Sequence, residues 1–371
     1  MRTKTDDVKS AGRVWIPLSP LTCRAQADKL SAVRTLLSLV LLALVLPVVV
    51  QAENFMYTTN NASLLVFIYT TNNGAITITR YAGKASAIII PRMINGLPVT
   101  SIGDRVFWSS LMAIGRRLEL TNITIPNTVT NIGNEAFFGC ERLTSVTIPN
   151  SVISIGDLAF AGCGLTSVTI PDSVTKLGNE AFACPHLTSI TIGNGVTSIG
   201  SNAFCECENL TNVIIGTSVT NIGYGAFCVC SRLRSVTIPD SVTSIGDCAF
   251  AISGLSKVTI GRGVTNIGNK AFYGSCLTSV TIPNNVISIG SEAFLSCHNL
   301  TNVTIGTGVT TIGNEAFYYC DRLKGVYFLG NAPSVGEKVF YDVNKPAIYY
   351  SPETTGWESF FRGRPSVPRN P

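Results

Sequence analysis

Charged residues are scarce in this chain, and histidine is nearly absent. Asp, Glu, Lys and Arg make up 13% of the 371 residues, and there are two histidines. The formal net charge of +5 falls to +1 after residue 52. Residues 1–52 hold seven of the 27 basic and three of the 22 acidic residues, which leaves 20 and 19. Nucleic-acid binding needs a clustered basic surface, so this balance argues against a nucleic-acid partner.

A hydrophobic run long enough to span a bilayer is also lacking. The longest apolar stretch, Leu36 to Val50, has about fifteen residues and is interrupted by Pro47, whereas a span needs about 20. Lys29 and Arg34 precede it and Ala52 follows it, which is the pattern of a secretory signal. We therefore expect cleavage, with a membrane anchor as the alternative. The mature form is expected to have no membrane span and to be secreted or cell-surface associated, either periplasmic or extracellular.

One pattern of 22 or 23 residues fills most of the remaining chain. The segment 143–163, LTSVTIPNSVISIGDLAFAGC, is a representative copy, and its Ile-Gly and Ala-Phe steps recur in register. One longer gap of 30 residues reflects an insertion after Phe107. Self-similarity at such a period indicates a solenoid of stacked coils. Most of the sequence is therefore committed to a repeated core.

Each position of the repeat has an expected structural role. Leu143, Val146 and Ile148 are predicted to point inward from a short strand that pairs in parallel with its copies. A second extended piece carries Ile155, and Asp157 is expected to cap a helical turn. The phenylalanines of successive copies are predicted to form a continuous spine inside the coils. Recurring glutamates beside this turn fit the positive end of a helix dipole.

The consensus LTSVTIPxSVTSIGxxAFxxC resembles the BspA-like (treponemal-type) leucine-rich repeat. The resemblance implies an α/β repeat solenoid, a curved right-handed leucine-rich-repeat coil. Its parts would be a parallel concave sheet, short convex strands and helical turns, with β caps at both ends. We expect an N-terminal extension and signal at 1–52, a β cap at 53–85, about eleven coils at 86–340, and a C-terminal cap and tail at 341–371. The family's usual role is exported protein–protein or cell-surface binding.

The concave face is the expected binding surface. The outward position between the last two inward residues of each strand is mostly threonine, and this uncharged ladder is formed by Thr124, Thr147, Thr169, Thr191, Ile214, Thr237, Thr259, Thr281, Thr304 and Tyr327. The alternative is β-propensity alone, because threonine suits a half-exposed strand whether or not anything binds. Arg234, Lys257 and Arg262 stand where other copies of the repeat have Thr, Ser, and Asn or Asp, and they lie in neighbouring coils. They form a candidate basic patch; the alternative is ordinary sequence drift on a solvent-exposed face.

Most of the twelve cysteines fall on one position of the repeat. This spacing predicts an inward column of thiols, with disulfides between neighbouring coils as the alternative. Cys205 and Cys228 lie off that column and should face away from it, which makes them the better disulfide candidate. Cys205-Glu206-Cys207 and Cys228-Val229-Cys230 look like paired zinc half-sites, but their offset is simply the repeat. We expect no metal or other cofactor.

Catalysis is not expected. His186 and His298 lie several coils apart, so neither a Ser-His nor a Cys-His pair is available. The sequence favours an exported, non-enzymatic binding protein whose partner is a protein or a surface glycan. The alternative is a passive structural component that assembles laterally through its repeats. The oligomeric state stays open.

Overall fold

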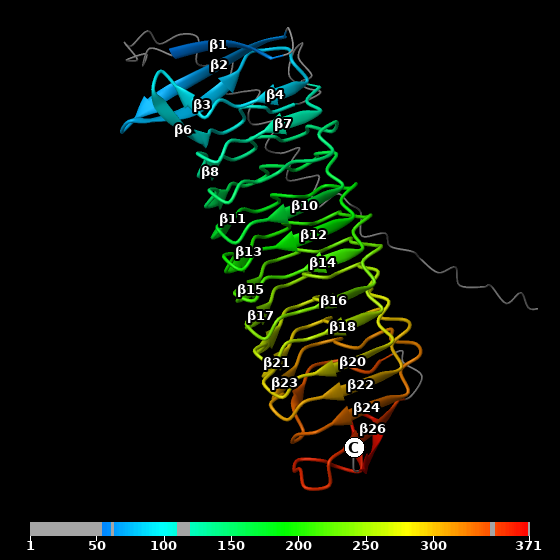
Figure 1. The fold of residues 1–371 in the computed structure, drawn as a ribbon. Coiled ribbons are helices and arrows are strands. Elements are labelled where there is room, and N and C mark those ends of the chain that lie inside the picture. The colour runs from blue at the N-terminus through cyan, green and yellow to red at the C-terminus, as the bar shows by residue number, and fades with distance from the viewer. Residues whose placement is uncertain (1–53, 61–62, 110–118, 342–345, 370–371) are drawn as a thin grey trace, which may run out of the picture. The chain divides into compact units, whose positions relative to one another are not determined.

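The structure is a computed structural model that describes residues 54–60, 63–109, 119–341 and 346–369. The chain forms two units, Met1–Ala52 and Glu53–Pro371. The expected extension and signal, and most of the insertion after Phe107, lie outside the described residues. In the second unit, about eleven coils of mostly parallel strands stack in a single column (Figure 1).

Most coils contribute strands to two rows, and the coil that contains β9 lacks a strand in the first. The first row comprises β4 (Ala87–Ile89), β7 (Asn122–Thr124), β10 (Ser167–Ile170), β12 (Ser189–Ile192), β14 (Asn212–Ile214), β16 (Ser235–Thr237), β18 (Lys257–Thr259), β20 (Ser279–Ile282), β22 (Asn302–Ile305), β24 (Gly325–Phe328) and β26 (Ala347–Tyr350). The second row comprises β6 (Leu97–Ile102), β8 (Asn131–Ile132), β9 (Ser154–Ile155), β11 (Lys176–Leu177), β13 (Ser198–Ile199), β15 (Asn221–Ile222), β17 (Ser244–Ile245), β19 (Asn266–Ile267), β21 (Ser288–Ile289), β23 (Thr311–Ile312) and β25 (Ser334–Val335). The rows run side by side down the column (Figure 1).

Antiparallel strands occur at both ends of this unit. β1 (Asn54–Asn60), β2 (Ser63–Asn72) and β3 (Ala75–Tyr81) form an antiparallel meander, and β3 then pairs in parallel with β6. The short strand β5 (Met93–Ile94) pairs antiparallel with β6. At the other end, β28 (Arg364–Pro368) pairs in parallel with β26 and antiparallel with β27 (Phe360–Phe361).

The core follows from the alternation of side chains along the strands. In β10, Val168 and Ile170 are buried while Ser167 and Thr169 are exposed. Inside the coils the phenylalanine rings stack from Phe107 to Phe340, with ring centroids between 4.9 and 6.0 Å apart. This confirms the predicted spine. Tyr81 and Phe67 extend it into the N-terminal strands, which the repeat pattern did not foresee.

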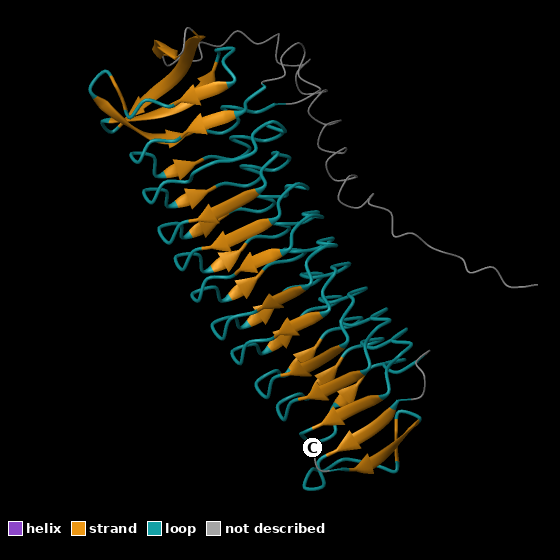
Figure 2. Cartoon of the chain, turned by 45° about the vertical axis from the view of Figure 1, so that its right-hand side comes forward, coloured by secondary structure: helices purple, strands orange, loops and turns teal. Residues whose placement is uncertain are grey.

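The predicted helical turns are wrong. No described residue is helical, and the Ala-Phe segments form tight turns (Figure 2). Glu135 and its counterpart Leu158 have φ of 53° and 56°, which breaks a right-handed helix at its start. The backbone N–H groups of Glu135, Phe137 and Gly139 instead donate to carbonyls of the next coil, each at 2.8 Å. Hydrogen bonds between coils therefore replace those within a helix.

The expected capping and dipole roles fail for the same reason. The Asp157 Oδ1 atom accepts a hydrogen bond at 2.7 Å from the N–H of Asn179, which lies in the next coil. Glu135 forms an ion pair at 2.7 Å with Arg105 of the preceding coil and does not face a helix end. These side chains join successive coils.

The glycine of the Ile-Gly step is required by close packing between coils. A Cβ atom on Gly178 would collide with the backbone of Gly156 and Asp157. The same approach recurs at Gly200 against Gly178, so a side chain at this position would push the coils apart.

Candidate functional site

The first row of strands presents the predicted ladder on one side of the coils, which we call the ladder face. Parallel register places Thr169 opposite Thr191, and Thr191 opposite Ile214. Further along, the structure pairs Thr237 with Thr259, Thr281 with Thr304, and Thr304 with Tyr327. Thr124, at the other end, pairs with Ile89, and Thr147 lies between β7 and β10 in the column. The structure thus brings the ladder residues into one column.

The hydroxyls on the ladder face are unpaired in the part of the chain that the structure describes. Among the described residues, the ladder threonine hydroxyls and those of Ser167, Ser189 and Ser235 on the same face form no hydrogen bond with the protein. These side chains are exposed or half-buried. The polar atoms of this face are therefore available to a ligand.

A neighbouring column of hydroxyls, which we call the rim threonines, behaves differently. Each donates to a backbone carbonyl of the preceding coil at 2.8–3.4 Å, and the column comprises Thr121, Thr166, Thr188, Thr211, Ser256, Thr278 and Thr301. Their carbonyl acceptors include those of Ser86, Thr144 and Arg234. The rim threonines thus join the coils, in contrast to the ladder threonines.

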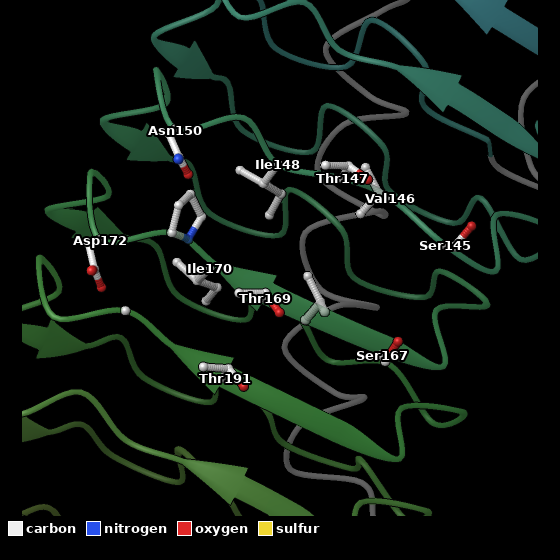
Figure 3. A pocket seen from close by; sticks show the side chains of 13 residues that line it. Ser145, Val146, Thr147, Ile148, Asn150, Ser167, Thr169, Ile170, Asp172 and Thr191 are labelled. Atoms are coloured by element: carbon white, nitrogen blue, oxygen red, sulfur yellow. The ribbon is translucent and has the colours of Figure 1, made fainter.

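Three hollows open on the ladder face. The first, about 610 Å³, contains Ser145, Thr147, Thr169 and Thr191 with Asp172 at one edge (Figure 3). The others measure about 850 and 780 Å³. Their linings include Ile214, Thr237 and Asp240 in the larger hollow, and Lys257, Thr281 and Asn284 in the smaller.

Each hollow lies where the pairing of first-row strands is interrupted. The strands of this row form separate sheets, with breaks between β14 and β16 and between β18 and β20. Residues 144–149 are not paired as a strand. Beside the breaks Val146, Val213 and Val258 are only partly buried, although the equivalent Val168, Val236 and Val280 are buried. The interruptions therefore expose apolar surface at the base of each hollow.

The structure brings together two of the three residues predicted as a basic patch. The Lys257 N–H donates to the Arg234 carbonyl, so these two lie side by side in adjacent coils. Arg262 lies beyond the other end of β18 in the same coil and lines two hollows. Its backbone N–H donates to Asp240 Oδ1 at 2.7 Å, which places a carboxylate nearby. Lys257 and Arg262 therefore border one hollow, whereas Arg234 adjoins Lys257 outside its lining.

Aromatic side chains complete the ladder face at its C-terminal end. Tyr327 stacks on Tyr349 of the next strand with ring centroids 4.8 Å apart. The Arg369 guanidinium lies 5.0 Å from the Tyr349 ring centre, within cation–π range. The sequence predicted Tyr327 as the end of the ladder but did not assign Tyr349 or Arg369 to it. Tyr349 lies in β26, where inward and outward side chains alternate as in the repeat strands, and this alternation could have assigned Tyr349 to the ladder face.

The cysteines form the predicted inward column. Seven buried thiols each donate to the carbonyl of a phenylalanine in the preceding coil at 3.0–3.3 Å, namely Cys140, Cys163, Cys184, Cys207, Cys230, Cys297 and Cys320. Burial raises the pKa of the Cys184 thiol to about 12. None of the described cysteines forms a disulfide in the structure, Cys205 and Cys228 included. A disulfide between these two stays a prediction.

Family comparison identifies the repeat. The model of the BspA type leucine rich repeat region matches residues 100–234 and 220–346 in six copies. The chain belongs to the BspA-type leucine-rich repeat family. A comparison with curated proteins gave no match.

Solved structures of leucine-rich repeat proteins are similar to this chain. One from Bacteroides ovatus is 26% identical over 81% of this chain and 84% of its own, with a TM-score of 0.60. The pneumococcal vaccine antigen PcpA is 17% identical over 80% and 82%, with a TM-score of 0.50, and so shares the fold. A leucine rich cell surface protein from Faecalibacterium prausnitzii is 26% identical over 80% and 76%, with a TM-score of 0.40.

Membership of this leucine-rich repeat family indicates a general role. Proteins of the family occur on bacterial surfaces, leucine-rich repeat domains typically mediate protein interactions, and the repeats generally serve as non-enzymatic scaffolds. In the described part of the chain, no three His, Cys, Asp or Glu side chains are grouped to hold a metal ion. Those residues also contain no helix that could cross a membrane.

Proposed function

We propose that this protein is exported and binds a protein or a surface glycan through the ladder face, without catalysis. The supporting observation is the contrast between two columns of hydroxyls. The rim threonines are hydrogen bonded between coils, whereas the ladder threonines have no partner among the described residues. Strand propensity explains threonine in both columns, but only the ladder column leaves its polar atoms for a ligand.

The rigidity of the face favours binding through many weak contacts. Thr169 and Thr191 are held in strands whose backbones pair in register, and their inward neighbours Val168 and Ile190 are buried. A preformed surface avoids most of the conformational entropy that a flexible binder loses on association. A ligand lying along the face meets a threonine hydroxyl in most coils, with an interruption at Ile214.

The hollows add specificity to this repeated pattern. Val213 and Val258 offer apolar contacts in two hollows, while Lys257 and Arg262 both line one of them. A ligand with an anionic group beside an apolar segment matches that arrangement. The aromatic pair of Tyr327 and Tyr349 offers a further contact at the end of the face.

Binding is tested by immobilising the full chain and measuring retention of purified matrix proteins and surface glycans. We expect Thr191→Lys and Thr237→Lys to weaken retention by about tenfold, or about 1.4 kcal/mol, because each places a long charged side chain in the ladder. Thr197→Lys is the matched control, since Thr197 is exposed in the same coil as Thr191 but adjoins the second row. Equal retention by all three variants, or no retention by the unmodified chain, would contradict the proposal. Insensitivity to the ladder variants together with self-association would favour lateral assembly instead.

Export is proposed from the N-terminal segment, which lies outside the described residues. We expect the mature protein to begin after Ala52. Intact-mass measurement of the protein recovered from culture medium and from cells checks this, and a product that retains Leu36–Val50 would show that the segment is kept.

A further inference from the structure

We propose that Cys205 and Cys228 form a reversible disulfide between two adjacent coils, by exchange with a small-molecule disulfide. This thiol pair lies away from the ladder face, so its formation is independent of ligand binding. No other side chain of the protein takes part in the bond.

The backbone already holds the two cysteines next to each other. The Phe204 N–H donates to the Ala226 carbonyl, and the Glu206 N–H donates to the Cys228 carbonyl, both at 2.9 Å. Cys205 lies between these bonds and is the counterpart of Cys228 one coil earlier. Neighbouring coils are spaced like paired strands, about 4.8 Å apart, which lies within the Cα separation of about 4.4–6.8 Å found for disulfides. The two thiols also hydrogen bond to each other.

Packing does not require cysteine at this position. The neighbouring coils have alanine in the same place, at Ala161, Ala183 and Ala251. Cys205 and Cys228 lie outside the hydrophobic core cluster, unlike the buried column. Two adjacent coils therefore share a pair of thiols at a position that other coils fill with alanine or with a larger side chain such as Tyr273 or Leu295.

Accessibility differs between the two thiols in a way that suits stepwise exchange. Cys228 is half-buried and therefore accessible to a small molecule, whereas Cys205 is 7% exposed. The hydrogen bond with Cys205 lowers the pKa of Cys228, while burial and Glu206 act in the opposite direction. A thiolate is the attacking form in thiol–disulfide exchange, so Cys228 is the thiol that reacts first.

The reaction balances with an oxidised low-molecular-weight disulfide, such as oxidised glutathione, as the oxidant. The Cys228 thiolate attacks one sulfur of the reagent, forms a mixed disulfide and releases one thiolate, which takes up a proton. Cys205 loses its proton and attacks the Cys228 sulfur, which releases the second thiolate. Two cysteine thiols are oxidised to one disulfide, and one reagent disulfide is reduced to two thiols.

The buried column provides the contrast within the same coils. Cys207 and Cys230 are fully buried, and their thiols donate to phenylalanine carbonyls at 3.3 Å. Burial raises the pKa of both thiols. They have the same spacing along the chain as Cys205 and Cys228 but lack a route to the reagent.

Peptide mapping of the full chain tests the proposal. The protein is equilibrated with oxidised or reduced glutathione, free thiols are alkylated, and a chymotryptic digest, which cuts between Cys207 and Cys228, is examined by mass spectrometry without reduction. We expect oxidised glutathione to abolish alkylation of Cys205 and Cys228 and to yield one cross-linked peptide pair. Because Cys205 and Cys207 fall in one peptide, the Cys207→Ser and Cys230→Ser variants assign the bond. Serine occupies their column naturally at Ser253 and Ser275, and we expect the cross-link to persist.

Two alanine variants test the order of reaction. Cys205→Ala should stop at a glutathione adduct on Cys228, while Cys228→Ala should leave Cys205 open to alkylation. Alanine at this position is native to other coils, and circular dichroism of each variant checks its fold. Full alkylation of Cys205 and Cys228 after oxidation would overturn the proposal. So would a cross-link that survives Cys205→Ala, or a bond from Cys228 to Cys248 of the next coil in the unmodified chain.

Discussion

The Asn134 side-chain oxygen accepts a hydrogen bond at 2.9 Å from the backbone N–H of Asp157, its counterpart in the next coil. Asp157 in turn accepts from Asn179, and Asn179 from Ser201, at 2.7 and 2.8 Å. This position of the repeat therefore joins a coil to the following one by a side chain where it is Asp or Asn, and the column is interrupted at Ser201 and Ser291, whose side chains are shorter.

Removing one of these side-chain acceptors should destabilise the solenoid. We expect Asp157→Ala to lower the free energy of unfolding by about 1 kcal/mol, the typical net value of one hydrogen bond. Asp157→Asn should retain most of the stability, since Asn134 performs the same role one coil earlier. Ser291→Ala is the control, because the Ser291 side chain forms no hydrogen bond between coils among the described residues. Urea unfolding midpoints measure the differences, and equal losses for Asp157→Ala and Ser291→Ala would contradict the assignment.

The phenylalanine stack should be the most sensitive part of the core. Phe227 is fully buried between Phe204 and Phe250, with ring centroids 5.2 and 5.3 Å away. Phe227→Ala is expected to cost about 3–5 kcal/mol, because it leaves a cavity between two rings. Ile214→Ala is the matched control, since Ile214 is 53% exposed and its loss should change stability by less than about 0.5 kcal/mol. Thermal unfolding followed by circular dichroism compares them, and a small effect at Phe227 would mean that the stack is dispensable.

Glu180 should make stability depend on pH. Burial is the main cause that raises the pKa of its carboxyl group, and no lysine or arginine is among the causes that offset it. A carboxyl whose pKa is higher in the folded state favours folding when protonated, and this contribution is lost as the pH rises through the folded pKa. We therefore expect Glu180→Gln to stabilise the protein at pH 7 and to have less effect near pH 4.

A paired glutamate at the same position of the repeat is the control for this pH effect. Glu292 forms an ion pair with Lys270 at 3.3 Å. Glu292→Gln removes that pair and should not stabilise the protein at pH 7. Unfolding midpoints measured from pH 4 to pH 7 distinguish the two variants. Stabilisation that is the same at every pH for Glu180→Gln would contradict the burial of a charged carboxylate.

Oxidation of Cys205 and Cys228 should raise thermal stability. A bond between them closes a loop of 23 residues (228 − 205). The loss of unfolded-state entropy for a loop of this length corresponds to about 3 kcal/mol. We expect a higher unfolding midpoint after treatment with oxidised glutathione, reversed by dithiothreitol. Cys205→Ala should show no such shift, whereas Cys207→Ser should still show it.

The basic residues that border one hollow should make ligand binding sensitive to salt. We expect Lys257→Gln and Arg262→Gln each to weaken binding of an anionic ligand by up to about fivefold, or 1 kcal/mol, as for exposed charge pairs. The affinity of the unmodified chain should fall with rising salt more steeply than that of the double variant, because screening acts on the interaction that the variant lacks. Lys176→Gln, an exposed change in the second row, should leave both quantities unchanged. Parallel salt curves for the unmodified chain and the double variant would exclude a role for this pair.

The repeat predicted the register of the fold because register follows directly from period. The pairing of Thr169 with Thr191 and the stacking of Phe160 on Phe182 both reflect the identical spacing of side chains in each coil. The helical turn was predicted wrongly because Asp157 has the residue type and position of a helix N-cap. Its actual partner is the N–H of Asn179, which is 22 residues away in sequence and comes close only through the stacking of the next coil.

The hollows could not be predicted from residue types. Val146 and Val168 occupy the same position of the repeat, yet only Val168 is buried. The difference arises from whether adjacent strands pair, which depends on small displacements between coils. Arg262 was grouped with Arg234 and Lys257 because the three lie in neighbouring coils, but Lys257 begins β18 and Arg262 lies beyond its other end. The curvature and hand of the coil stay predictions.

The uninterrupted ring stack makes each coil interchangeable with the next. Phe204, Phe227 and Phe250 present equivalent faces to their neighbours, so a deletion that removes one whole coil would bring Phe204 against Phe250 in the same geometry. Genes built from such units change length in whole-coil steps without a new core having to evolve. The length of the ladder face that can contact a partner is then set by the number of coils that the gene encodes.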